Sequence, residues 1–447
     1  MSNASPLVDA PLGPTMLRLA IPGVIGALLT TTPALVEAAF LKESGVQALA
    51  AVALVYPIVI LSGMFSAGAF GGAVSGFIAR AIGAGDMQQA SGVLVCASLI
   101  SIVGGILMWL LVLGFGPLIY QAASDNSTVV DSAHYYATLL FPVLPAYWLI
   151  NMLSSVLRGS GDMVRPALVA AVLLGSYCLF AWLLIPLQDA STLESIRGAA
   201  FAMAGSYLVA AALVVVFVLL PSQPIRFRLG AFRMNLLLQI LKQGSLAATQ
   251  SVMTVVYALV TTIIFSGYGT DWLAGFGLAV RLELIMVPVI FGIGASMIAI
   301  VGAYVGAGRR SEAIAIAWRG IAVNVILIGV LGLLLAIFPG IWCTLVGSDA
   351  AVIGSCNRSL QVVAPTYAFF ALGLSCYLIS QALNTLAFPV LGALVRLLIV
   401  ASGLYWVSGT TAIDHALYLV ALAAVVYGVV VAAGLRAGPW RPEAAAR

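Results

Sequence analysis

The sequence predicts an all-α integral membrane protein with twelve transmembrane helices arranged in two similar six-helix lobes. Hydrophobic residues make up 63% of the 447 positions and charged residues 8%, which is too little polar surface for a soluble protein of this length. The first half also recurs in the second at an offset of 223 positions, so that Pro142 and Pro166 are matched by Pro365 and Pro389. Repeated halves predict two similar lobes.

Two shorter pairs support the repeat. The segment GAGDMQQA (83–90) matches GAGRRSEA (306–313), and SGVQALAAVAL (44–54) matches YGTDWLAGFGL (268–278) at one more residue of offset. We place the lobes at 1–221 and 222–447. The connecting segment carries two prolines and four basic residues, which is typical of a linker leading into an amphipathic stretch at the lipid headgroups, or of a plain tether.

The apolar runs give the number of membrane spans, because a helix needs about 20 residues to cross about 30 Å of hydrocarbon. Six runs lie in each half, and an even number means that both halves begin on the same side of the membrane. This predicts a pseudo-two-fold axis along the membrane normal. The predicted spans are 16–41, 50–80, 89–115, 130–157, 164–187, 198–220, 237–267, 271–305, 312–338, 351–383, 389–409 and 413–436.

The basic residues predict the orientation, since Lys and Arg beside membrane spans remain in the cytoplasm. With a cytoplasmic N-terminus, only Lys42, Arg197 and Arg358 fall on the outer side. The first apolar run is too long for a cleavable signal peptide and no A-x-A-like site follows it. We therefore expect a multi-pass membrane protein with both termini in the cytoplasm. The expected cytoplasmic residues are Arg18, Arg80, Arg158, Arg165, Arg226, Arg228, Arg233, Lys242, Arg309, Arg310, Arg319, Arg436, Arg441 and Arg447.

The five cysteines occur singly, without C-x-x-C spacing, and are interpreted as buried small residues. Pairing of Cys343 with Cys356 near the outer surface is the alternative. Signatures of enzymes are absent from the sequence, including H-E-x-x-H, G-x-S-x-G and Walker A, and His134 and His415 have no partner cluster. No basic cluster indicates nucleic acid. We expect no enzyme activity, no cofactor and no metal centre.

Glu37 is an acidic residue inside the first predicted helix, four positions after Pro33. An ionisable group within the bilayer costs roughly 2.5 to 3.5 kcal/mol on insertion scales, which favours a functional role. Because Pro33 cannot donate a hydrogen bond to the carbonyl of Leu29, the helix is predicted to bend there. A carboxyl group in such surroundings can exchange protons near neutral pH or bind a cation. The alternative is a hydrated carboxylate close to Lys42 and Glu43.

Arg281 and Glu283 form the second ionisable pair, in the eighth predicted helix. Two positions correspond to about 200° around a helix, so the two side chains point to nearly opposite faces. We expect one of them to face a cleft and the other to lie within the second lobe. Arg396, early in the eleventh helix, is interpreted as reaching the cytoplasmic headgroups. The turn containing Arg158, Asp162 and Arg165 is interpreted as a gate or a topology element.

Aromatic and sulfur side chains can form an adaptable surface for bulky apolar cations. Each candidate is also a reasonable packing or interface residue. The candidates for the cleft are Tyr56, Met64, Tyr147, Trp148, Met152, Tyr257, Met286, Tyr367 and Tyr377.

At these motifs the chain resembles the multidrug and toxic compound extrusion (MATE) transporters, nearer the DinF-like than the NorM-like branch. The resemblance rests on VEAAFLKESGVQALAAVAL, GAGDMQQA, RGSGDMVRP, GLAVRLELIMVP and VGAYVGAGRR, in that order. It implies a V-shaped secondary antiporter of the inner membrane that exports organic cations or amphipathic compounds in exchange for H⁺ or Na⁺. It also implies that Glu37 replaces the usual aspartate of the first helix and that Glu283 matches a second-lobe cation site.

Two features depart from the family pattern. Tyr177 and Ala181 stand where DinF-like members carry an Asn and an Asp in the fifth helix. Residues 367–384 lack the acidic group of NorM-like members. The resemblance favours H⁺ coupling through Glu37, and Na⁺ bound at Glu37 is the alternative. It also favours a hinge at Pro33 and a monomeric protein. Two rival functions remain. One is the export of a single natural product. The other is the flipping of a lipid-linked or polyanionic substrate, and a flippase of this kind is expected to have several arginines in its cavity.

Overall fold

The computed structural model describes residues 7–8, 10–185, 191–221, 223–347, 349–406 and 413–441. Over these residues it contains twelve helical segments that are long and apolar enough to cross a membrane, which confirms the predicted number. The largest differences at the boundaries are a third span that continues to Ala123 and a sixth that begins at Thr192. The C-terminal ends predicted for spans 164–187 and 389–409 lie outside the described residues.

The first half supplies six spans. The second span consists of α2, the π-helical turn η2 and α3, and the fourth span consists of α5 and α6 joined by a short 3-10 turn. The elements are α1 (Leu12–Leu41), α2 (Val46–Gly63), η2 (Met64–Phe70), α3 (Gly71–Gly83), α4 (Met87–Ala123), α5 (Ser127–Leu140), α6 (Leu144–Gly159), α7 (Val164–Leu184) and α8 (Thr192–Leu219).

The second half repeats this order, with one short extra helix before α14. The second span of this half, which is the eighth of the chain, is broken between α10 and α11. The elements are α9 (Met234–Ser266), α10 (Thr270–Val280), α11 (Glu283–Gly306), α12 (Arg310–Ile337), α13 (Gly340–Val346), α14 (Ala350–Val363), α15 (Tyr367–Leu383), α16 (Ala387–Trp406) and α17 (Ile413–Ala437).

Two hydrophobic cores lie side by side. One is built from α2 to α8 and includes Leu236 and Ile240 from the start of α9. The other begins at Ala247, further along α9, and continues to the last helix, taking in Leu19 of α1. Leucines on the outside of α4, such as Leu110 and Leu111, are about half exposed, as expected for a surface that faces lipid.

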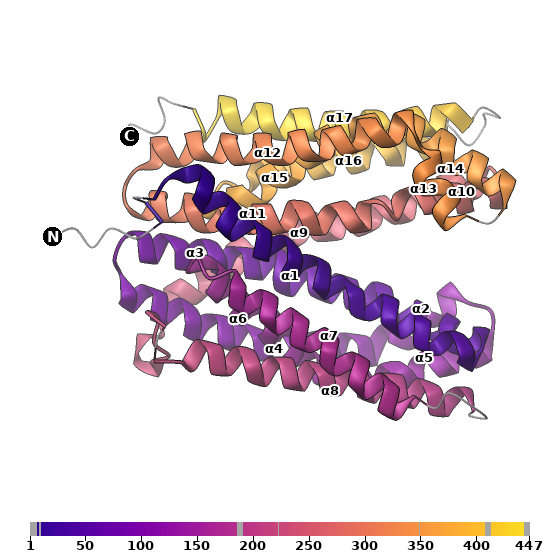
Figure 1. Cartoon of the computed structure of the whole chain (residues 1–447), viewed down its shortest axis with the longest axis horizontal. Helices are drawn as coiled ribbons and strands as arrows, with labels where there is room; N and C mark the ends of the chain where they lie inside the picture. The colour runs from indigo at the N-terminus through magenta and orange to yellow at the C-terminus, as the bar shows by residue number, and fades with distance from the viewer. Residues whose placement is uncertain are drawn as a thin grey trace.

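Helix α1 connects the two cores. It starts at the end of the bundle where both chain termini lie and crosses the front of the molecule diagonally (Figure 1). It packs against α11 of the second half and against α7 of the first. A change in α1 therefore acts on both halves at once. We call the end with the two termini the terminal end, and the end with α10, α13 and α14 the distal end.

Contacts between the halves gather near the terminal end. Arg80 of α3 donates hydrogen bonds to the carbonyl oxygens of Gln381 (3.0 Å) and Ala382 (2.6 Å) at the end of α15. The side chain of Gln381 donates to the carbonyl of Gly68 at 3.1 Å, and within the second half Gln243 donates to the Gln381 carbonyl at 2.7 Å. The bonds to the carbonyls of Gln381 and Ala382 satisfy groups that the C-terminus of α15 leaves free.

Small residues let α3 and α11 approach closely at the same end. A Cβ atom added to Gly306 would lie 2.0 Å from the Arg80 carbonyl oxygen, and one added to Gly83 would lie 2.1 Å from that of Ala303. Glycine is needed at such positions because any side chain would push the two backbones apart. The terminal end is therefore closed by direct contact between the halves.

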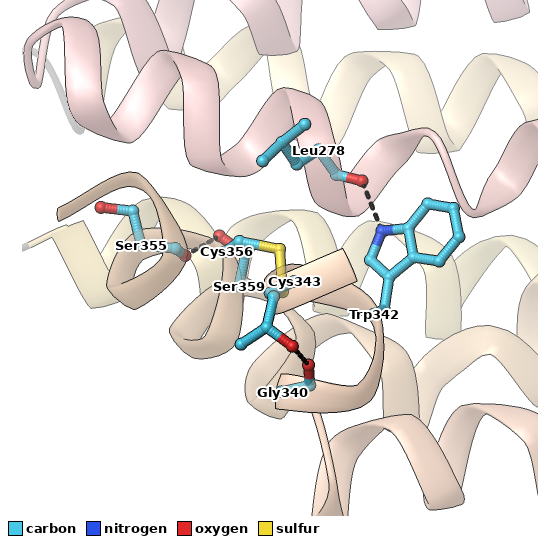
Figure 2. The surroundings of a disulfide bond; sticks show 8 residues. Leu278, Gly340, Trp342, Cys343, Ser355, Cys356 and Ser359 are labelled. Carbon is cyan, nitrogen blue, oxygen red and sulfur yellow. Dashed lines mark hydrogen bonds between the residues drawn. A yellow bond between two sulfur atoms is a disulfide. The ribbon is translucent and has the colours of Figure 1, made fainter. Parts of the chain in front are cut away.

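At the distal end, a disulfide joins Cys343 of α13 to Cys356 of α14, so the pairing given as the alternative is the one observed. Trp342, beside Cys343, donates its indole N–H to the Leu278 carbonyl at 2.9 Å, as Figure 2 shows. The break after α10 leaves this carbonyl available, because the amide of Leu282 bonds to Ala279 instead. The disulfide-linked pair thus supports the broken eighth span.

Candidate functional site

A cavity of about 360 Å³ lies between the two halves, within the size range of drug-binding pockets. Most of its walls come from α1, α2, α6 and α7, and α11 and α15 close it from the second half. The lining is mainly apolar. Among the described residues, Glu37 and Arg158 are the lining side chains that carry formal charge.

Glu37 lies in the wall of this cavity and is only 3% exposed. The hydroxyl group of Tyr136, on α5, donates a hydrogen bond of 2.6 Å to its Oε1 atom. A hydrogen bond to a charged acceptor is stronger than one between neutral groups. The carboxyl group is therefore held at a fixed position between α1 and α5, inside the first core and in contact with the cavity.

Pro33 lines the same cavity, one turn before Glu37, and α1 is a continuous helix across it. The hydroxyl groups of Thr31 and Thr32 donate hydrogen bonds to the carbonyl oxygen of Leu28 at 2.9 and 3.0 Å. Threonine bonds of this kind accompany bends in helices. The role of Pro33 as a hinge stays a prediction.

Four of the predicted cleft residues line the cavity, and three of them, Tyr56, Met64 and Tyr147, come from the first half. Tyr147 is packed against Tyr207 of α8, with ring centroids 4.8 Å apart. Tyr377, also a candidate, lines the cavity from α15. These rings give the cavity an aromatic wall that suits flat apolar molecules.

The π-helical turn η2 shapes the wall near Met64. Asn151 donates from its amide to the Ser66 hydroxyl at 2.8 Å, and Trp148 donates its indole N–H to Ser62 at 2.9 Å. Trp148 is buried in the first core and does not line the cavity. Its contribution is to fix α6 against the second span. Segments of π-helix are frequent at functional sites.

Four other predicted cleft residues are buried in a core and lie outside the lining of this cavity, so their assignment to a substrate cleft stays a prediction. Burial by neighbouring helices explains this result, since an apolar residue packs equally well toward lipid, core or cleft. They are Met152 in the first core and Tyr257, Met286 and Tyr367 in the second.

Arg281 and Glu283 also lie outside the lining of this cavity. Arg281 follows the end of α10 and is exposed, whereas Glu283 is partly buried in the first turn of α11. Glu283 interacts electrostatically with Arg396 of α16. The second half thus holds an acidic and a basic group near each other in its interior.

Arg396 does not reach the lipid headgroups, so the interpretation made from the sequence is wrong. It is 7% exposed, and its guanidinium carbon lies 3.8 Å from the centroid of Tyr257, 5.1 Å from Phe370 and 5.7 Å from Tyr427. The residue occupies the middle of α16 and faces the core, so its stem cannot reach the membrane surface. Three aromatic faces replace water around the charge.

Sequence reasoning missed the role of Arg158. A stripe on α6 formed by Tyr147, Asn151, Ser154 and Arg158 lines the cavity, and its spacing of three and four residues places these side chains on one helix face. That spacing is visible in the sequence. Tyr136 and Tyr207 also line the cavity, but no stripe of polar residues at this spacing marks them in the sequence.

Comparison with known proteins shows where the chain belongs. The profile of the family described as MatE matches residues 22–183 and 247–406. A FAD transporter from Shewanella oneidensis is 25% identical over 324 residues, covering 70% of each chain. A probable multidrug resistance protein NorM from Thermotoga maritima is 21% identical over 360 residues, covering 80% of this chain and 77% of the relative.

A solved structure gives the same result for the fold. A transporter of the MOP superfamily from Pyrococcus furiosus, described as having a binding pocket of reversed polarity, matches with a TM-score of 0.89 at 20% identity. The match covers 100% of this chain and 99% of the other. The two chains therefore share one fold from end to end.

Proposed function

Because this chain belongs to the MatE family, we propose that it is a secondary antiporter that exports organic or amphipathic compounds through the cavity between its halves, in exchange for H⁺. The observation that carries the proposal is the buried Glu37 in the cavity wall, held by Tyr136 at 2.6 Å. One carboxyl group with a neutral hydroxyl partner can gain and lose a proton without leaving its place. Na⁺ at Glu37 is the alternative coupling ion.

The coupling follows from the position of α1. Loading Glu37 with a proton changes the hydrogen bonding between α1 and α5, and α1 also packs against α7 and α11. The proton therefore changes the relative free energies of two arrangements of the halves. The terminal end is closed in this structure, so the opposite arrangement must open the contacts of Arg80 and Gly306.

The proposed orientation, with the terminal end in the cytoplasm, is supported by the basic residues beside the spans, and the inner membrane is the location that the proposed antiport requires. The disulfide between Cys343 and Cys356 supports this orientation, because it lies at the distal end and disulfides persist in oxidising compartments. With this orientation the structure is closed toward the cytoplasm. Compounds then leave from the cavity toward the outside.

A dedicated exporter is the second candidate function. The similarity to a FAD transporter over 70% of the chain favours it, although the cavity has the apolar and aromatic walls of a multidrug site. A flippase for polyanionic substrates calls for several cationic groups, and among the described lining residues Arg158 alone is cationic.

Everted vesicles test the proposal, with ΔpH and a Na⁺ gradient imposed separately. We expect uptake of an ethidium-like dye to follow ΔpH and to be unchanged by Na⁺. If uptake responds to the Na⁺ gradient alone, the coupling ion is Na⁺ and not H⁺. A response to neither gradient would exclude secondary antiport of the dye.

A further inference from the structure

Arg158 lies in the cavity wall without a carboxylate partner. It is in the last turn of α6 and is partly buried. The other charges of the same turn pair with each other, since Arg165 donates to Asp162 at 2.9 Å. Among the described residues, no carboxylate lies within ion-pair distance of Arg158. Its positive charge is thus uncompensated by a neighbouring side chain.

The contacts of Arg158 leave part of its guanidinium group available. One nitrogen donates to the Ser155 hydroxyl at 2.6 Å, and the group lies 5.6 Å from the ring centroid of Phe291, on α11. A guanidinium group has five N–H donors in a planar fork. A role limited to the helix dipole requires only a positive charge near the last carbonyls. It does not require a side chain that lines a cavity and reaches the opposite half.

The position of Arg158 marks the base of the cavity. Phe291 precedes Gly292, whose carbonyl oxygen would lie 2.8 Å from a Cβ atom on Gly23, so Arg158 is at the level of Gly23 in α1. Glu37 lies fourteen residues further along α1, or about 20 Å at 1.5 Å per residue. The two opposite charges are therefore far apart, and the Coulomb repulsion between an anion near Arg158 and the Glu37 carboxyl group falls with this distance.

We propose that Arg158 forms an anion-binding subsite, so that among compounds with an aromatic or apolar body this cavity binds those with a carboxylate, sulfonate or phosphate group more tightly than the forms that lack it. The anionic group binds the free donors of Arg158, and Asn151 and Ser154 line the same wall. The apolar body occupies the aromatic part of the cavity near Tyr56 and Tyr147. The inference rests on the proposed function and specifies its substrate class.

Two dyes that differ in one group test the subsite: rhodamine 110, which carries a free carboxylate, and rhodamine 123, its methyl ester. Their dissociation constants are measured by fluorescence polarisation with the purified full-length chain in detergent. We expect Arg158→Gln to weaken binding of the acid by about 10-fold or more, as for loss of a charge-assisted hydrogen bond, and to change binding of the ester by less than 2-fold. Arg158→Lys, which keeps the charge but loses the fork, should fall between.

Arg319→Gln is the matched control, because it removes one arginine charge from an exposed position of α12 outside the cavity. It should bind both dyes as the wild type does. A test on the wild-type chain alone covers the case in which Arg158→Gln does not fold: benzenesulfonate should displace rhodamine 110 at much lower concentration than benzenesulfonamide. Equal displacement, or equal losses for the two dyes in Arg158→Gln, would overturn the subsite.

A lipid headgroup offers the same chemistry as a soluble anion, so the binding measurement is repeated in nanodiscs of phosphatidylcholine with and without phosphatidylglycerol. Unchanged binding of rhodamine 110 assigns the subsite to the substrate. Displacement by phosphatidylglycerol that Arg158→Gln abolishes would overturn that assignment in favour of a lipid. A chain that discriminates between the dyes yet exports neither would overturn the proposed function and leave the subsite.

Discussion

The hydroxyl group of Tyr136 donates a 2.6 Å hydrogen bond to Glu37 and so joins α5 to α1 at the cavity wall. This bond holds the one acidic group that the cavity offers among its described lining residues. It also connects a proton-binding site to a helix that packs against both halves. The predictions below follow from this arrangement and from the contacts around it.

Tyr136→Phe removes the hydrogen bond and keeps the ring. A hydrogen bond to a charged group contributes about 1.5 to 3 kcal/mol, so the protonation equilibrium of Glu37 should change. We expect dye efflux driven by ΔpH to fall by about 10-fold and its pH profile to move, at equal protein level. The control is Tyr135→Phe, because Tyr135 is adjacent but does not line the cavity. Wild-type efflux and an unchanged pH profile in Tyr136→Phe would show that this bond has no part in coupling.

Gly306→Val should weaken the closure of the terminal end, because the added Cβ atom would lie 2.0 Å from the Arg80 carbonyl. Spin labels at Gln88 and Ser311, which are exposed in the first turns of α4 and α12, report the separation of the halves. We expect the distance distribution to shift to longer values. Gly114→Val is the control, since nothing lies within 4 Å of a Cβ at that position. The same distribution in both variants would contradict the closed contact.

Arg396 and Glu283 should behave as a coupled pair in the second half. Arg396→Gln leaves Glu283 without its nearby positive charge and removes the contact with the Tyr257 ring at 3.8 Å. We expect a clear loss of thermal stability in each single variant. The loss in Glu283→Gln/Arg396→Gln should be smaller than the sum of the two, because the double variant removes both charges. Strictly additive losses would mean that the two groups do not interact.

The disulfide between Cys343 and Cys356 closes a loop with a sequence separation of 13, which corresponds to about 3 kcal/mol in the chain-entropy description. Cys343→Ser/Cys356→Ser should therefore lower the apparent melting temperature by several degrees, and reduction of the wild type should do the same. Cys178→Ser, at a free and partly buried cysteine, is the control. If reduction leaves the melting temperature of the wild type unchanged, the bond does not stabilise the distal end.

The sequence was sufficient for the helices and for part of the site. Twelve spans follow from length and hydrophobicity alone, because the bilayer demands continuous apolar helices. Glu37 stood out because an acidic group inside a span is costly. The rotation of each helix was not accessible in the same way, since lipid is as apolar as a protein core. Met152, a cleft candidate in the sequence, and Arg396, expected at the headgroups, both turn toward a core.

For Arg158 the sequence offered only local information. A basic residue in the last turn of a helix commonly serves the helix dipole or the membrane topology, and its sequence neighbours Asp162 and Arg165 suggested a charged turn. Those two pair with each other at 2.9 Å, whereas Arg158 reaches the cavity and Phe291. Contacts between residues more than one hundred positions apart decide its role.

The most direct test of the account is dye transport in everted vesicles driven by ΔpH, comparing Glu37→Gln and Glu37→Asp with the wild type. The control is Glu312→Gln, an exposed glutamate paired with Arg309 at the terminal end. We predict that Glu37→Gln abolishes transport driven by ΔpH, that Glu37→Asp retains part of it, and that Glu312→Gln matches the wild type. Wild-type transport by Glu37→Gln at equal protein level would contradict the assignment of Glu37 as the coupling residue.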